Sequence, residues 1–187
     1  MPALFLALLT SALAMLGGKP ARLTARLSGR LGAGAGLLVV CWATAGATAA
    51  LAAWAGGWLE PKMAPAAKAM FVAAALAVSA LELLFARARS GPAEPTRSLG
   101  AMALVLLAEQ VTDAARFFVL ALTVATGEPA LAAAGGALGS GTVLTAAWAM
   151  GEDWEAKLPL RAIRFGASGL FLAAAVIVAL SARGLIG

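Results

Sequence analysis

The chain has 187 residues, of which 62% are hydrophobic and only 12% are charged, and its mean hydropathy is +0.92. Soluble domains are about 45–50% apolar and about 25% charged, so this composition predicts an integral membrane protein. The chain has no His and a single Cys, Cys41. These counts exclude a Cys/His zinc site, a His-dependent triad, haem ligation by His and a disulfide within the chain.

Six apolar stretches follow one another along the chain, separated by turn residues and breakers. They cover residues 1–17, 34–59, 66–86, 99–126, 130–150 and 160–182. A helix needs about 20 apolar residues to cross a bilayer, so each stretch is close to that length. The sequence therefore predicts an all-α bundle of six transmembrane helices, with no separate soluble domain.

Charges lie mainly between the apolar stretches, and their distribution predicts an orientation. Ten basic residues fall in the first, third and fifth loops: Lys19, Arg22, Arg26, Arg30, Arg87, Arg89, Arg97, Lys157, Arg161 and Arg164. Three fall on the opposite side: Lys62, Lys68 and Arg183. Because basic residues in short loops stay in the cytoplasm, we expect both chain termini outside it. The short loops favour the bacterial inner membrane, and we expect no nucleic-acid partner despite the pI of about 10.4.

The two halves of the chain repeat each other. An offset of 94 residues aligns the second and third stretches with the fifth and sixth, and the matched pairs include two Trp and two Pro: Trp54 with Trp148, and Pro65 with Pro159. Three crossings per half would make the second half enter the membrane from the opposite side. We therefore expect an inverted repeat of residues 1–90 and 98–187, with any substrate site near the midplane between the halves.

The fourth stretch contains the only intramembrane cluster of polar and ionisable residues. Its members are Glu109, Gln110, Thr112, Asp113 and Arg116. Such residues are costly in a bilayer, so they usually mark function or a tight pair. On one continuous helix, Glu109 and Asp113 would stack four residues apart. Their oxygens suit hard divalent cations, while an ion pair between Asp113 and Arg116 is the alternative.

Several segments give the chain a resemblance to a known family of transporters. The segment Leu158–Arg164, the residues Leu120–Leu122 and Gly127–Pro129, and the inverted halves resemble the uncharacterised-protein-family-sixteen cation exchangers. That family includes the Golgi manganese and calcium transporters. The resemblance implies exchange of Mn²⁺ or Ca²⁺, and acidic cation ligands in a Glu-x-Gly-Asp motif on the first helix of each half.

The resemblance places the two motifs of this chain but also shows that they are degenerate. The second motif falls on Gln110, Val111, Thr112 and Asp113, and the first on Met15, Leu16, Gly17 and Gly18, followed by Lys19. Of the four acids that the family carries, only Asp113 remains in register. Glu109 lies one residue early and could replace a ligand only if the helix is locally rotated or unwound.

The first half departs from the second in one further way. Arg22, Arg26 and Arg30 recur every four residues, each followed by Leu. This spacing predicts an amphipathic helix over residues 20–31 that follows a break near Gly18. Its arginines could contact lipid phosphates, bind the acidic surface of a partner protein, or serve only to set the topology.

Two functions are consistent with these features. The first is a divalent cation exchanger with a path along Asp113, Gln110, Thr112 and Glu109, in which Arg116 modulates the charge. The second is a transport-inactive accessory subunit of a larger membrane complex. A small homodimer, with a glycine-rich helix face as the contact, is an intermediate possibility. We expect no resident cofactor. We also expect no enzyme, because no nucleophile lies beside a base.

Overall fold

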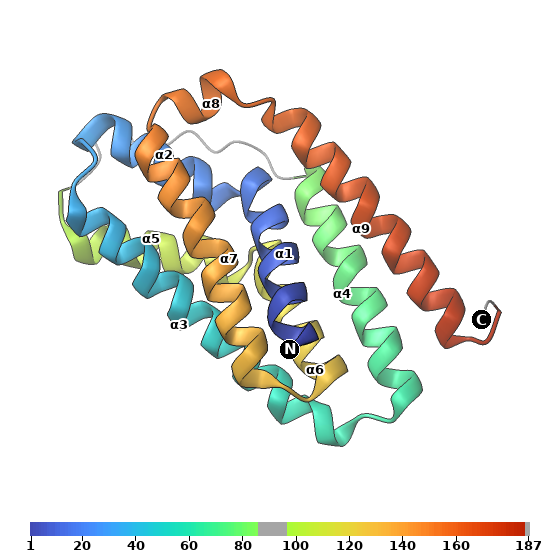
Figure 1. The fold of residues 1–187 in the computed structure, drawn as a ribbon. Helices are drawn as coiled ribbons and strands as arrows, with labels where there is room; N and C mark the ends of the chain where they lie inside the picture. Colours follow the sequence, from blue (N-terminus) through green and yellow to red (C-terminus); the bar gives the residue numbers. More distant parts are fainter. Residues whose placement is uncertain (86–96, 186–187) are drawn as a thin grey trace.

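The computed structural model describes residues 1–85 and 97–185, and these residues form helices joined by short turns (Figure 1). The helices are α1 (Pro2–Gly17), α2 (Lys19–Leu31), α3 (Ala35–Leu59), the short 3₁₀ helix η1 (Glu60–Lys62), α4 (Pro65–Phe85), α5 (Leu99–Val111), α6 (Ala114–Thr126), α7 (Pro129–Met150), α8 (Asp153–Lys157) and α9 (Leu160–Ala182). The expected all-α class is confirmed for the part of the chain that the structure describes.

Four of these helices, α3 with η1, α4, α7 and α9, are long and apolar enough to cross a membrane. A fifth crossing is possible if α1 and α2, which meet at an angle of 60°, are counted as one broken crossing. Many large apolar side chains of the helices are exposed, including Leu104 of α5 at 70% and Trp54 of α3 at 69%. Lipid would cover such surfaces, so the chain is a multi-pass membrane protein.

The fourth apolar stretch is not the continuous helix that the sequence predicted. It is divided into α5 and α6, with Thr112 and Asp113 between them. Asp113 has extended backbone angles and caps α6, because its side chain accepts a hydrogen bond from the backbone N–H of Ala115 at 3.0 Å. Aspartate is a preferred N-cap for this reason. The expected stacking of Glu109 on Asp113 along one helix is therefore wrong.

Close approach of helices is made possible by glycines of α7. A side chain at Gly135 or Gly139 would collide with the backbone carbonyls of Leu4 and Leu8 in α1, and one at Gly141 would meet the ring of Trp42. Small residues at such crossings let helix backbones come together in membranes. This face of α7 is therefore occupied by the chain itself, which argues against its use as a homodimer contact.

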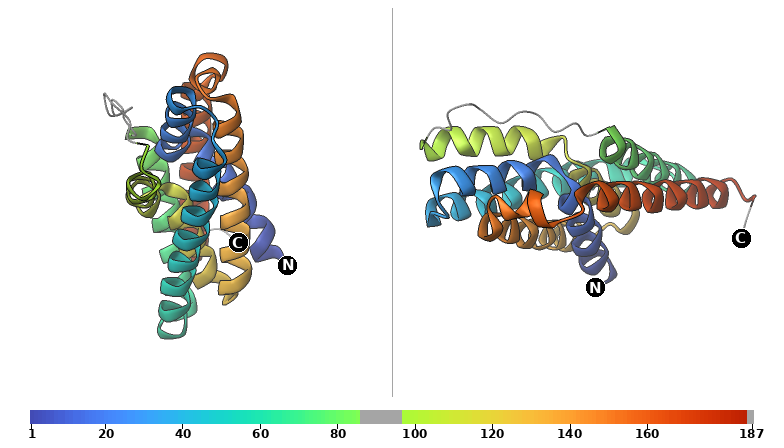
Figure 2. Two further views of the ribbon diagram at one scale, coloured as in Figure 1. Left: turned by 90° about the vertical axis from the view of Figure 1, so that its left-hand side faces the viewer. Right: turned by 90° about the horizontal axis from the view of Figure 1, so that it is seen from above.

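The turns of the bundle gather at two opposite ends (Figure 1). The α2–α3 turn and α8 lie at one end, whereas the N-terminus, the α3–α4 turn with η1 and the α6–α7 turn lie at the other. Helix α3 packs along α7, and α4 packs along α9. The two further views in Figure 2 show that α5 lies along one side of this arrangement and that the N-terminal end of α1 protrudes from the opposite side. Helix α1 packs against α6, α7 and α9.

Candidate functional site

The site is built where the break in α1–α2 meets the break in α5–α6. Gly18 separates α1 from α2 in an extended conformation, and Asp113 separates α5 from α6 in the same way. A Cβ added at Gly18 would lie 2.9 Å from Oδ2 of Asp113, so the two breaks face each other. These are the two residues that the degenerate motifs place at the same motif position.

Asp113 is the most deeply buried acid of the described part of the chain, with 1% of its surface exposed. Its Oδ1 is used in capping α6, but its Oδ2 is buried and has no hydrogen-bond partner among the described residues. A buried charged group without a partner is costly, and in a membrane such a group usually marks a functional site. The free oxygen is directed at the backbone of Gly18, where no side chain competes for it.

Gln110 lies in a second polar region, on the other side of the α5–α6 break. Its Nε2 donates to Oγ1 of Thr44 at 2.8 Å, and Oγ1 of Thr48 donates to its Oε1 at 3.2 Å. Both threonines belong to α3, and all three side chains are buried. The amide is therefore held by α3, as a positioned polar group and not as a freely rotating one.

Arg116 is directed toward the same region and not toward Asp113. Its Nη2 donates to Oγ of Ser140 at 2.9 Å and to Oε1 of Gln110 at 3.4 Å. Its Nε and Nη1 are buried and have no partner among the described residues. The alternative of a simple Asp113–Arg116 ion pair is therefore not what the structure contains. Each of the two charges instead makes its own contacts.

The other two candidates for the cation path lie away from this centre. Thr112 is exposed at the break, and Glu109 is half-buried on α5. The structure brings Gln110 and Arg116 together and places Asp113 against Gly18, whereas Thr112 contributes to neither contact. Among the described residues, no group of three or more His, Cys, Asp or Glu side chains could hold a metal ion.

The first motif contributes packing and one ion pair to the site. Met15 is fully buried, and Gly17 lies against the side chain of Arg164. Nζ of Lys19 lies 2.8 Å from Oε1 of Glu82 in α4. Sequence reasoning missed this pair, because residues 63 positions apart carry no local signal of their contact. It also missed Thr44, Thr48 and Ser140, which look like ordinary helix residues in an alanine-rich sequence.

The arginines of α2 face the end of the bundle where α8 lies. Arg26 contacts Glu155 of α8, with Nη2 3.0 Å from Oε1, and both side chains are about one-third exposed. Arg22 is half-buried and Arg30 is exposed. Oγ of Ser28, on the same helix, donates to the backbone carbonyl of Trp148 at 2.6 Å. Helix α2 is thus bound to the α7–α8 region of the second half.

Arg87 and Arg89, which were counted for the orientation, lie outside the described residues.

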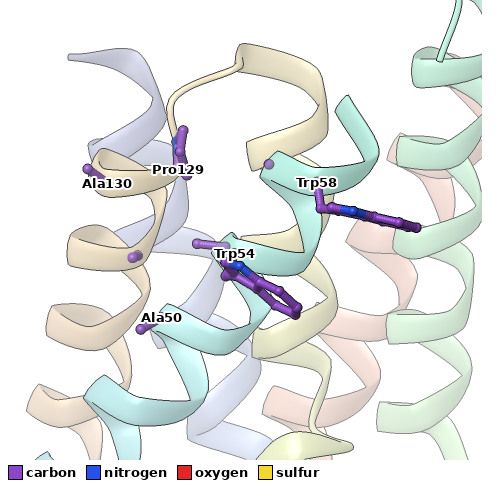
Figure 3. Close-up of a pocket in the computed structure, with 8 residues that line it drawn as sticks. Ala50, Trp54, Trp58, Pro129 and Ala130 are labelled. Carbon is purple, nitrogen blue, oxygen red and sulfur yellow. The ribbon is translucent and has the colours of Figure 1, made fainter. Parts of the chain in front are cut away.

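A groove on the surface has a different character. It has a volume of about 560 Å³, lies between α3 and the start of α7, and is lined only by Ala, Gly, Pro and Trp residues (Figure 3). Trp54 and Trp58 come from α3, and Pro129 and Ala130 from α7. None of the side chains in its lining carries an oxygen, so this groove offers no side-chain ligand to a hard divalent cation.

Comparisons of the chain with protein-family models, with curated proteins and with solved structures find no match.

Proposed function

We propose that this chain is a transporter-type membrane protein that crosses the bilayer six times and binds a cation at Asp113. In this proposal the two halves are inverted repeats, with α1–α2 and α5–α6 as the discontinuous crossings. Discontinuous helices that meet near the midplane are typical of the substrate sites of such transporters. The packing of α3 along α7 and of α4 along α9, each pairing equivalent helices, supports this arrangement.

One observation carries the proposal: the buried Oδ2 of Asp113 has no partner among the described residues and faces Gly18. A carboxylate in this position needs a proton or a cation to offset the loss of hydration. A site that can hold either one can exchange one for the other. The mechanism that follows is proton–cation exchange, in which the halves rock against each other and a proton replaces the cation on Asp113.

The resemblance to the uncharacterised-protein-family-sixteen exchangers makes Mn²⁺ and Ca²⁺ the first cations to test. Both prefer oxygen ligands, which the carboxylate of Asp113 and nearby backbone carbonyls of α1 can provide. The carbonyls of Ala14 and Met15 lie beside Gly18, on the same side as the free oxygen. A single carboxylate compensates only half of a divalent charge, so we expect binding weaker than in a site with several acids.

A transport-inactive accessory subunit is the second candidate, and one observation favours it. The described residues hold no cluster of three potential metal ligands, while a guanidinium lies close to the only buried acid. In this case the chain would keep the architecture of a transporter and act through a partner in a larger membrane complex. Gentle solubilisation and purification of the native protein tests this candidate: migration as a lone chain without a stoichiometric partner argues against it.

Flux through reconstituted protein tests the first candidate. Proteoliposomes with the wild-type chain should take up Mn²⁺ or Ca²⁺, and Asp113→Asn should reduce this flux at least tenfold. Asp153→Asn is the matched control, because Asp153 is an exposed residue of α8 paired with Lys157 and lies outside the site. Equal flux in wild type and Asp113→Asn would remove Asp113 from the mechanism, and an absence of flux in wild type would favour the accessory role.

A further inference from the structure

Four uncharged polar side chains gather around one guanidinium in the bundle. Thr44 and Thr48 of α3, Gln110 of α5 and Ser140 of α7 are all buried, and we call them the amide–hydroxyl cluster. The two threonines bond to the amide of Gln110, and the side-chain oxygens of Gln110 and Ser140 both accept hydrogen bonds from the guanidinium. Neutral oxygens in such an arrangement are ligands that hard cations accept.

Arg116 already occupies this cluster. Nη2 of Arg116 donates hydrogen bonds to Oγ of Ser140 at 2.9 Å and to Oε1 of Gln110 at 3.4 Å, and the residue is only 3% exposed. Arginine remains protonated in proteins, so its charge cannot be removed by loss of a proton. The cluster therefore holds a permanent positive charge that is covalently attached to α6.

No acid pairs directly with this charge in the described part of the chain. Asp113 lies three residues before Arg116, but its Oδ1 caps α6 and its Oδ2 faces Gly18. Two donors of the guanidinium, Nε and Nη1, have no described partner. A structure that needed Arg116 only for stability would be expected to satisfy these donors, because unpaired buried charges are costly.

We propose that Arg116 is a specificity-determining residue, a built-in cation that keeps divalent ions out of the amide–hydroxyl cluster. The inference rests on the proposed cation binding at Asp113. It adds the reason why a cation binds on the Asp113 side of the α5–α6 break and not in the amide–hydroxyl cluster. Like charges a few ångströms apart repel strongly where water is scarce. Arg116 also uses the oxygens of Gln110 and Ser140, so a cation would have to displace it to gain them.

Binding of Mn²⁺ to the full-length protein in detergent tests the inference, with free Mn²⁺ measured by electron paramagnetic resonance. Arg116→Gln should lower the Kd for Mn²⁺ at least tenfold relative to wild type. The substitution removes the positive charge and also the hydrogen bonds that the guanidinium donates to Ser140 and Gln110. Arg116→Lys should stay close to wild type, because the charge remains. Arg161→Gln controls for net charge, since Arg161 is exposed at the start of α9.

Two outcomes would overturn the inference. One is a Kd for Arg116→Gln no lower than that of wild type, including the case in which neither binds Mn²⁺. The other is an equal gain for Arg116→Gln and Arg161→Gln, which would mean that only the net charge matters. The proposed function fails differently, in that Asp113→Asn would then bind Mn²⁺ and transport it as wild type does.

Gln110→Glu keeps the inference testable if Arg116→Gln does not fold. The new carboxylate would lie within reach of Arg116, and we expect it to pair with the guanidinium and not with a metal. The melting temperature should therefore rise or stay unchanged, and the Kd for Mn²⁺ should not fall. A Kd at least tenfold lower for Gln110→Glu alone would show that Arg116 does not exclude the cation, and would overturn the inference.

Discussion

The carboxylate of Asp113 lies against Gly18, so that the break between α5 and α6 meets the break between α1 and α2. Both residues have extended backbone angles and both precede the first residue of a helix. One provides the acid, and the other provides the space that its free oxygen occupies. The absence of a side chain at position 18 is therefore part of the site.

Gly18→Ala tests this relationship. The new Cβ would lie 2.9 Å from Oδ2 of Asp113 and 3.2 Å from the carbonyl oxygen of Met15, closer than carbon atoms normally approach. We expect overpacking to cost about 1–3 kcal/mol of stability and to displace the carboxylate. Thermal unfolding in detergent and Mn²⁺ binding would measure the two effects.

Gly34→Ala is the control for that substitution. Gly34 also has extended backbone angles and precedes a helix, α3, but an added Cβ there would meet nothing within 4 Å. The two substitutions therefore share any loss of helix capping and differ in the close contacts of the new Cβ with Asp113 and with the carbonyls of Ala14 and Met15. Equal melting temperatures and equal Mn²⁺ affinities for the two variants would argue against a role for the space at Gly18.

Composition was sufficient to predict the class of this protein, and local signals predicted part of the fold. The break after Gly17 could be expected, because a Gly-Gly-Lys-Pro sequence followed by arginines every four residues cannot continue an apolar crossing. The break at Thr112 was missed, because the alanine- and leucine-rich sequence on both sides favours a helix. Asp113 as an N-cap was the only available signal, and the continuous apolar pattern outweighed it.

The candidate site was predicted in its ionisable members and, from the polar cluster and the resemblance, in Gln110 and Gly18. Ionisable residues in an apolar stretch stand out in the sequence, so Asp113 and Arg116 could be named. Their partners could not, because the hydrogen bonds of Arg116 to Ser140 and of Gln110 to Thr44 join different helices, over 24 and 66 residues of the chain. Which of two charges faces which neighbour depends on helix rotation, and a single sequence does not determine it.

Ser140→Ala should destabilise the protein through Arg116. The substitution removes the 2.9 Å acceptor of Nη2 and leaves a further donor of a buried guanidinium without a partner. Loss of such a partner costs about 1–3 kcal/mol. Thr142→Ala on the same helix is the comparison, because Thr142 is exposed and bonds only to the backbone of α7. A lower melting temperature for Ser140→Ala than for Thr142→Ala is expected, and the reverse order would contradict the role given to Ser140.

Arg164→Gln should weaken the contact between α4 and α9. Nε of Arg164 donates to the carbonyl of Leu83 at 3.0 Å and Nη2 to that of Leu84 at 3.2 Å, so this side chain satisfies carbonyls at the end of α4. Hydrogen bonds to a charged group contribute about 1.5–3 kcal/mol, and partial exposure of Arg164 places the effect in the lower part of this range. Arg161→Gln, with the same change of charge on an exposed residue, should change the unfolding free energy by less than about 0.5 kcal/mol. Equal losses in the two variants would mean that the charge, and not the capping of α4, is responsible.

The inverted repeat makes a prediction about two lysines. Lys62 and Lys157 are 95 residues apart, within one residue of the 94-residue offset that aligns Trp54 with Trp148 and Pro65 with Pro159, so they lie in corresponding loops of the two halves. Lys62 ends η1 and Lys157 ends α8, at opposite ends of the bundle (Figure 1). In a Cys41→Ala background, a membrane-impermeant maleimide added to intact cells should label Lys62→Cys.

The same reagent should label Lys157→Cys only after the membrane has been opened, because the basic residues of its loop hold it in the cytoplasm. Labelling after solubilisation gives the total reactivity of each variant and controls for local accessibility. Inverted halves require that equivalent positions lie on opposite sides of the bilayer. Labelling of both variants from the same side would therefore refute the inverted repeat, and with it the expectation of a site at the midplane between the halves.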